Sequence, residues 1–199
     1  MPSQLFHVKY EKLYASLKVI VEESERRVLN NEPDVLMIDN VNFFVKSYLI
    51  SICTYLESFL QDLAFDYAND INSRLKKAAL PHNYFLWRMA KDFKPKDLNF
   101  SNVDLKITKE DISKGLSANP YKTISLFRFL GVNLASQDEF SGNVGLVDMV
   151  VNKRNSIIHH NDRAADVSFS DLKSYIDVFI PYMKSVERAV SLKREEAKY

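Results

Sequence analysis

The stretch "KRNSIIHHND", residues 153–162, contains the side chains with the clearest capacity for chemistry. Arg154 and Asn155 are followed by two adjacent histidines, His159 and His160, in a chain with only 4 histidines. Histidine accepts or donates a proton near neutral pH, and the planar guanidinium of arginine matches the oxygens of a phosphate. The stretch therefore has residues for proton transfer beside a bound anion, or it simply ends a helix.

Arg154 lies in the middle of an apolar helix face. At about 100° per residue, the apolar side chains of this helix fall within an arc of roughly 120°. They are Val147, Val150, Val151, Ile157 and Ile158. A buried guanidinium needs an anion, because an unpaired buried charge is very costly. That anion is a carboxylate in one interpretation and a phosphate in another, and in a third the side chain extends along the helix to solvent.

The spacing within the stretch leaves the geometry of a shared site open. Asn155 and His159 are four residues apart and lie nearly above one another on an ideal helix. Arg154 and His159 are about 140° apart on the same helix. A shared site then requires the helix to end near the histidines, or the long Arg154 side chain to reach around it. The Arg-to-His spacing alone is a weak signal.

The whole combination, Arg-Asn-x-Ile-x-His late in an apolar helix and followed by a last long helix, resembles the HEPN superfamily. Its hallmark is an Arg, then four to six residues, then a His, often with a polar residue directly after the Arg. "RNSIIH" matches with Arg154, Asn155 and His159. His160 also satisfies the spacing and stands where related sequences commonly have Gly. Either histidine could be the working one, and the pattern favours His159.

A second segment carries the resemblance upstream. "TYLESFL", with Glu57, resembles the second-helix segment of HEPN families in prokaryotic toxin and defence loci. Glu57 lies at the edge of an apolar helix face, where it is either a partner for Arg154 or an ordinary solvated glutamate. The resemblance covers residues 10–75 and 141–195.

The resemblance implies a metal-independent endoribonuclease without a cofactor. Cleavage by the neighbouring 2′-hydroxyl would leave 2′,3′-cyclic phosphate and 5′-hydroxyl ends. His159 would transfer the proton, Arg154 would stabilise phosphate charge and Asn155 would orient one of them, with His160 and Glu57 as accessory residues.

The resemblance also implies partners. RNA would be the substrate, and two protomers would pair as a homodimer with their motifs facing one cleft. The protein would act as a toxin or antiviral defence effector, held in check by an inhibitory antitoxin or defence-system partner. The alternative is a non-catalytic helical module that binds RNA, a nucleotide or a protein partner.

The elements that position these residues are helices. Apolar periodicity predicts long helices over residues 11–30, 41–75 and 144–160 and from 168 onward, with a possible break at Pro181. A short helix is expected at 121–131, followed by a loop at 132–143. Four long helices and one elaborated connection predict an all-α, four-helix up-and-down bundle with additional short helices in an insertion at about 81–120. Residues 1–199 are expected to form a single domain.

A second candidate nucleic-acid surface lies in the segment "PHNYFLWRMAKDFKPKDLNF", residues 81–100, where aromatic and basic residues alternate. Trp87, Arg88 and Lys91 are its candidate RNA contacts, because aromatic rings stack on unpaired bases and cations follow the phosphates. The alternative is that the aromatic residues cover the open end of the bundle.

Composition and sequence patterns also argue against several other classes of protein. A formal net charge of +1 predicts no strong global field for nucleic acid. The single Cys53 fits a reducing compartment and a place in the core. No signal peptide and no run near 20 apolar residues is recognised, so a cytoplasmic protein without a membrane partner is expected. No metal site is expected, and His7 and His82 are read as structural or surface residues.

Overall fold

The computed structural model describes residues 5–89, 98–160 and 166–197. Within these ranges the chain forms eight α-helices and one short 3-10 helix, and no β-strand. The α-helices are α1 (Phe6–Leu29), α2 (Val35–Asp39), α3 (Val41–Lys77), α4 (His82–Met89), α5 (Lys109–Gly115), α6 (Pro120–Phe129), α7 (Asp138–His160) and α8 (Phe169–Glu196); the 3-10 helix is η2 (Leu134–Ser136). The all-α class expected from the sequence is confirmed.

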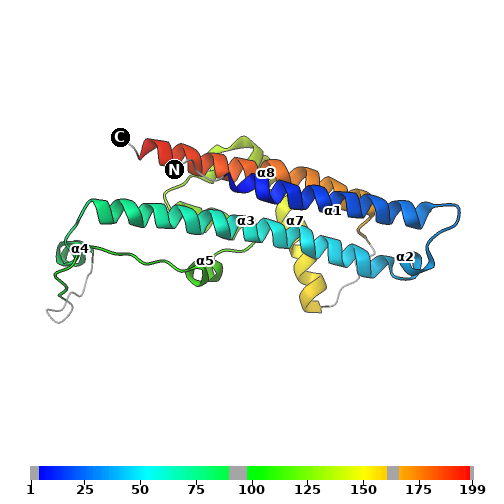
Figure 1. Ribbon diagram of the computed structural model, residues 1–199, viewed down its shortest axis with the longest axis horizontal. Coiled ribbons are helices and arrows are strands. Elements are labelled where there is room, and N and C mark those ends of the chain that lie inside the picture. The colour runs from blue at the N-terminus through cyan, green and yellow to red at the C-terminus, as the bar shows by residue number, and fades with distance from the viewer. Residues whose placement is uncertain (1–4, 90–97, 161–165, 198–199) are drawn as a thin grey trace.

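Four long helices carry the core. α1, α3 and α8 run together along the long axis of the molecule, and α7 crosses them steeply (Figure 1). α1 packs against α3 and α8, and α7 packs against the same two helices. Because α7 crosses α3, its last turns extend beyond the body of the bundle (Figure 1).

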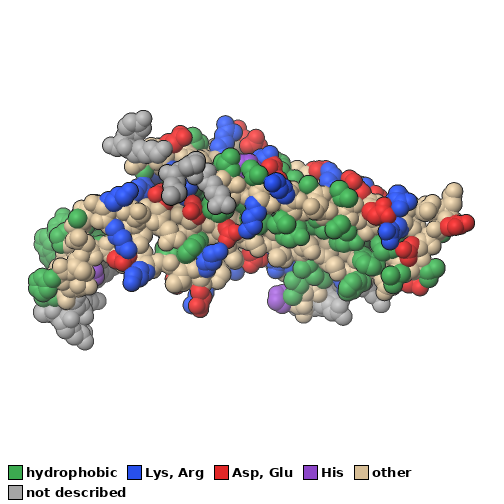
Figure 2. Space-filling model, viewed as in Figure 1, with side chains coloured by type: hydrophobic (Ala, Val, Ile, Leu, Met, Phe, Trp, Pro, Cys, Tyr) green, Lys and Arg blue, Asp and Glu red, His purple; other side chains and the backbone are tan. Residues whose placement is uncertain are grey.

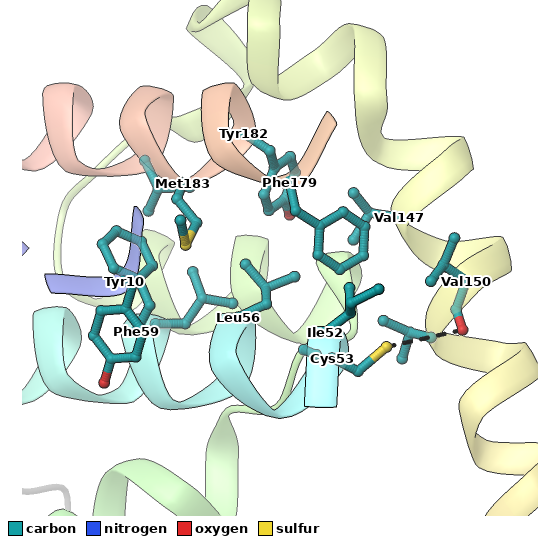
Figure 3. Packing of buried hydrophobic residues seen from close by; sticks show 14 of the residues in the cluster. Tyr10, Ile52, Cys53, Leu56, Phe59, Val147, Val150, Phe179, Tyr182 and Met183 are labelled. Atoms are coloured by element: carbon teal, nitrogen blue, oxygen red, sulfur yellow. Dashed lines mark hydrogen bonds between the residues drawn. The ribbon is translucent and has the colours of Figure 1, made fainter. Parts of the chain in front are cut away.

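Acidic and basic side chains are mixed over the visible face of the molecule (Figure 2). This mixture agrees with the formal net charge of +1. The core beneath it is formed by apolar side chains from all four long helices (Figure 3). α3 contributes Val45, Leu49, Ile52, Cys53, Leu56, Phe59, Leu60, Leu63, Ala64, Tyr67 and Ala68. Apolar residues on so much of its circumference make α3 the central helix of the bundle.

By length and composition, α3 is the one helix among the described residues that could cross a membrane. An 18-residue window of it has a mean hydropathy of 1.2, although no membrane-spanning run is expected from the sequence. The core helix of a bundle has the same composition, and 39% of this window is buried inside the protein. Packing against α1, α7 and α8 therefore accounts for the apolar residues of α3.

α7 begins earlier than the sequence predicts. Residues 138–143, expected in a loop, form its first turns, and residues 134–136 form η2. Phe140 is fully buried and its ring stacks on that of Tyr182 in α8, with centroids 4.7 Å apart. Gly142 and Gly145 favour a loop locally, but burial of Phe140 outweighs their weak preference.

α8 begins where the sequence predicts and is not divided. Ser168 and Asp171 form the expected capping box: the Ser168 hydroxyl accepts from the Asp171 amide at 3.1 Å, and the Asp171 carboxylate accepts from the Ser168 amide at 2.8 Å. The helix continues through Pro181 to Glu196. α6 ends as expected before Gly131, whose φ of 78° suits glycine.

The predicted insertion contributes to the core. Within residues 81–120, α5 begins at a capping box formed by Thr108 and Asp111. Ile112, Leu116 and Ala118 are buried in the same core as the long helices. This part of the segment therefore packs against the bundle, in contact with α3.

Candidate active site

Arg154 on α7 and Glu57 on α3 form an ion pair. The Arg154 Nη2 atom donates to the Glu57 Oε2 atom at 2.6 Å. The Arg154 side chain is 16% exposed and that of Glu57 is 30% exposed, so the pair lies at the edge of the core. The structure thus brings together two residues that lie 97 positions apart in the sequence. Among the interpretations of Arg154, the carboxylate partner is the one observed.

The location of Arg154 follows from the packing of α7. Val147, Val150, Val151 and Ile157 are buried, as the apolar face predicts. The prediction is wrong for Ile158, which is 48% exposed. Residue 158 lies in the last turn of α7, which extends beyond the body of the bundle (Figure 1). Ile157 in the same turn is still buried, so Arg154 lies within the packed part of α7, one turn before its exposed end.

Asn155 is the second hydrogen-bond partner of the Arg154 guanidinium. The Arg154 Nη1 atom donates to the Asn155 Oδ1 atom at 3.2 Å. The Arg154 Nε atom is buried and has no hydrogen-bond partner within the described part of the chain. Two fixed contacts orient the guanidinium, and it keeps donor capacity for an anion.

Glu57 is held in turn by Gln61, one helical turn further along α3. The Gln61 Nε2 atom donates to the Glu57 Oε1 atom at 3.5 Å and to the backbone oxygen of Leu116 at 3.2 Å. A polar chain thus connects the end of α5 through α3 to Arg154. Gln61 is not among the residues predicted from the sequence, although its position four residues after Glu57 places it on the same side of the helix.

Cys53 lies in the core beside this ion pair. Its thiol is fully buried and donates to the backbone oxygen of Val150 at 4.0 Å (Figure 3). Burial raises the pKa of the Cys53 thiol to about 12, and the nearby Arg154 opposes this rise only in part. The thiol is therefore protonated at neutral pH, which agrees with the expected core role and not with a nucleophile.

His159 is exposed and does not contact Arg154. No hydrogen bond or ion pair joins His159 to any residue in the described ranges. α7 stays helical through residue 160, so Arg154 and His159 point about 140° apart around it. Asn155 lies between them in angle and one turn before His159, on nearly the same line. The three residues thus follow one another around α7 without forming a closed site.

Other predicted residues are distributed differently. Trp87 and Arg88 lie on α4, at the far end of α3 from α7 (Figure 1). Lys91 and the side chain of His160 lie outside the described part of the molecule. Among the described residues, no group of three or more His, Cys, Asp or Glu side chains is placed to hold a metal ion.

Two hollows elsewhere on the surface have volumes similar to small-ligand sites. One, of about 360 Å³, lies between α6 and η2 and is lined by Ile124, Arg128, Gly131, Val132, Asn133, Leu134 and Ala135. The other, of about 350 Å³, is lined by Phe6, Lys9, Asp62, Phe65, Asp66, Asn69 and Lys109. Neither includes Arg154, Asn155 or His159. These two hollows are therefore separate from the pair formed by Arg154 on α7 and Glu57 on α3.

Comparison with known proteins identifies the family. No curated protein and no solved structure matches the chain. The family model RiboL-PSP-HEPN matches residues 9–192, a range that includes all four long helices but for the ends of α1 and α8. HEPN domains have nuclease or other RNA-related functions, and they often bind RNA and dimerise. The chain belongs to the RiboL-PSP-HEPN family.

Proposed function

We propose that this protein is a metal-independent endoribonuclease that acts through Arg154, Asn155 and His159. The observation that carries the proposal is the held guanidinium of Arg154, which Glu57 and Asn155 orient at the edge of the core. An arginine fixed in this way is prepared for a phosphate, since little rotamer freedom remains to be lost on binding. Membership in a HEPN family supports the same chemistry.

The reaction needs a base, an acid and a cation. The base removes the proton of the RNA 2′-hydroxyl, the O2′ atom forms a bond to phosphorus, and the bond from phosphorus to O5′ breaks. The products are a 2′,3′-cyclic phosphate and a 5′-hydroxyl, the latter formed when O5′ takes up a proton. We assign both proton transfers to His159, which takes the 2′-hydroxyl proton as base and gives a proton to O5′ as acid. Its exposed position at the end of α7 leaves it accessible to RNA. Arg154 stabilises the charge on the phosphate, and Asn155 orients the groups beside it.

This assignment requires a homodimer. Within one chain Arg154 and His159 point in different directions, so a closed site requires a second surface opposite α7. A second copy of the chain would supply it, with His159 of one protomer completing the phosphate site around Arg154 of the other. The exposed Ile158 next to His159 offers apolar surface for such a contact.

Complementation between two inactive variants tests the shared site. Arg154→Ala and His159→Ala proteins are each expected to be inactive. Mixed under conditions of subunit exchange, they should recover about one quarter of wild-type activity, because half of the dimers are mixed and each holds one intact site. No recovery, in a mixture shown to contain mixed dimers, would show that each chain builds its own site.

Cleavage itself is tested with purified protein, RNA and EDTA, followed by analysis of the new ends. The wild type should give cyclic-phosphate ends, and His159→Ala should give none. His160→Ala is the matched control, since it removes the neighbouring imidazole. If His160→Ala loses cleavage and His159→Ala keeps it, proton transfer belongs to His160. Arg154→Lys should also be impaired, because lysine keeps the charge but loses the planar fork.

The alternative function is a non-catalytic module that binds RNA, a nucleotide or a protein. The divergence of His159 from Arg154 within one chain favours it. Binding of RNA without cleavage, equally strong in wild type and His159→Ala, would establish this alternative over the enzyme.

The biological setting we propose is that of a toxin or antiviral effector restrained by an antitoxin or another defence-system partner. The resemblance of the segment around Glu57 to HEPN families of such loci supports this setting. Expression of the wild type without its restraint should stop bacterial growth, whereas expression of His159→Ala should not. Equal growth with both proteins at matched levels would contradict the proposed toxicity.

A further inference from the structure

α4 presents an aromatic surface to solvent, and none of its residues is buried. Tyr84 is 56% exposed and Trp87 is 64% exposed. Their rings lie side by side, with centroids 6.1 Å apart, and the Arg88 guanidinium carbon lies 5.3 Å from the centroid of the Trp87 ring. These rings therefore do not cover the end of the bundle, which was one of the two interpretations of the sequence.

Hydrogen bonds hold the start of α4. Residues 101–103 run antiparallel to residues 80–82, and the His82 amide donates to the Ser101 oxygen at 3.0 Å. The Val103 amide donates to the Leu80 oxygen at 2.9 Å, and the Val103 side chain is buried. The Leu105 amide donates to the Asn72 Oδ1 atom of α3 at 2.9 Å, so residues 101–105 connect the start of α4 to α3. Tyr84, Trp87 and Arg88 thus lie on an exposed helix whose first residue is held in place.

The surroundings of α4 are basic. Residues 70–89 and 98–106 contain five basic side chains and two acidic ones, a net charge of +3, whereas the whole chain has +1. Arg74 pairs with Asp70 and Lys76 pairs with Asp104. Figure 2 shows the hydrophobic side chains at this end of the molecule with Lys and Arg side chains beside them. Exposed rings with adjacent excess positive charge fit a ligand that is both flat and anionic.

We propose that Tyr84, Trp87 and Arg88 form a docking site for unpaired nucleotides of RNA. The bases stack on the two rings and the Arg88 guanidinium, and the basic side chains around α4 attract the phosphates. Unpaired RNA fits better than a protein partner, because an apolar protein surface would not use the positive charge. The inference rests on the proposed ribonuclease function for the nature of the substrate.

The position of this docking site sets a requirement on substrate length. From Glu57 to Lys77, twenty residues of α3 at 1.5 Å each correspond to about 30 Å. With about 3.4 Å for each stacked nucleotide, roughly nine nucleotides span that distance. A stacked RNA strand that occupies both sites must therefore be longer than this, and cleavage falls at a distance from the docked nucleotides.

Trp87 is the only tryptophan of the chain, so its fluorescence reports on α4 alone. The experiment uses the full-length His159→Ala protein, which keeps the RNA intact, and a single-stranded 15-nucleotide oligoadenylate. We expect the RNA to quench Trp87 fluorescence, with an apparent affinity that falls as salt is raised. A duplex of the same length should not quench it, because its bases are not free to stack.

Substitutions then measure the contribution of the ring. RNA affinity is measured by the fluorescence anisotropy of labelled RNA. In the His159→Ala background, Trp87→Ala should weaken RNA binding about 5- to 100-fold, and Trp87→Phe should retain most of the affinity. Phe129→Ala is the matched control: Phe129 is 83% exposed, follows an arginine and lies on α6. It should leave the affinity unchanged.

Unchanged affinity in Trp87→Ala, or RNA binding without quenching, would overturn the docking site. Equal loss in Trp87→Ala and Phe129→Ala would overturn it as well, since the effect would then be nonspecific. These readouts measure binding, so they separate the docking site from the enzyme. If Trp87→Ala, with His159 intact, cleaves RNA as fast as the wild type, the docking site is refuted and the nuclease is retained. If RNA quenches Trp87 but the wild type does not cleave it, the docking site is retained and the nuclease is refuted.

Discussion

The pair between Arg154 and Glu57 makes the most direct quantitative prediction. Removing one partner of a fully buried ion pair costs about 3–5 kcal/mol, whereas an exposed pair contributes about 0–1 kcal/mol. With side chains 16% and 30% exposed and a 2.6 Å contact, this pair lies between those limits. We therefore expect an interaction free energy of about 2 kcal/mol between the two residues.

A double-mutant cycle measures this interaction. Glu57→Gln keeps the shape of the side chain, and Arg154→Met keeps an unbranched chain that can pack against the core. The four proteins are unfolded in urea at one fixed protein concentration, because association shifts apparent stability. The double variant should lose about 2 kcal/mol less than the sum of the single variants, and each single variant should melt several degrees lower than the wild type.

Two results would refute this reasoning. Effects that add within about 0.5 kcal/mol would mean that the contact contributes no specific stability. An interaction that disappears in 1 M salt would place the pair in open solvent, since salt screens exposed charges much more strongly than partly buried ones. A pair that passes both tests holds Arg154 in place before RNA arrives.

Three further predictions concern the scaffold. Phe140→Ala should lower the free energy of unfolding by about 3–5 kcal/mol in urea titrations, because it removes a fully buried ring. Glu187→Gln should cost about 1–2 kcal/mol by the same assay, since the Glu187 carboxylate accepts from the first amides of α1 at 2.7 and 3.0 Å. Burial raises the pKa of Cys53 from 9.0 to about 12, so the folded state keeps a proton that the unfolded chain releases. Stability should therefore fall as pH rises above about 9, by up to 1.4 kcal/mol per pH unit for this group, and Cys53→Ala should remove that part of the dependence. No destabilisation in the first two variants, or an unchanged pH slope in the third, would contradict these contacts.

The fold was largely predictable because its signals are local. Apolar periodicity located α3 almost to its ends, and the Ser168 and Asp171 pattern located the start of α8. The first turns of α7 could not be located in this way. Their sequence contains Gly142, and the buried contact between Phe140 and Tyr182, 42 residues later, favours the helix there.

The residues of the candidate site could be predicted from the sequence, but most of the contacts between them could not. An arginine in an apolar stripe needs an anion or a path to solvent, so electrostatics marked Arg154 as unusual but left a carboxylate, a phosphate and solvent as alternatives. Which carboxylate it would be depended on the crossing of α3 and α7. His7 shows the same limit: it looks isolated in the sequence, yet its Nδ1 atom lies 2.6 Å from the Glu187 carboxylate, 180 residues away.

The sequence by itself determined three properties of this protein: the approximate bounds of most of its long helices, an arginine within an apolar helix face, and histidines able to transfer a proton. These properties are local, since they depend on periodicity, side-chain chemistry and spacing along one helix. Only the tertiary structure decided that Glu57 pairs with Arg154 and that Trp87 is exposed. Those outcomes depend on which helix faces are covered, and that is set by contacts between residues far apart in the chain.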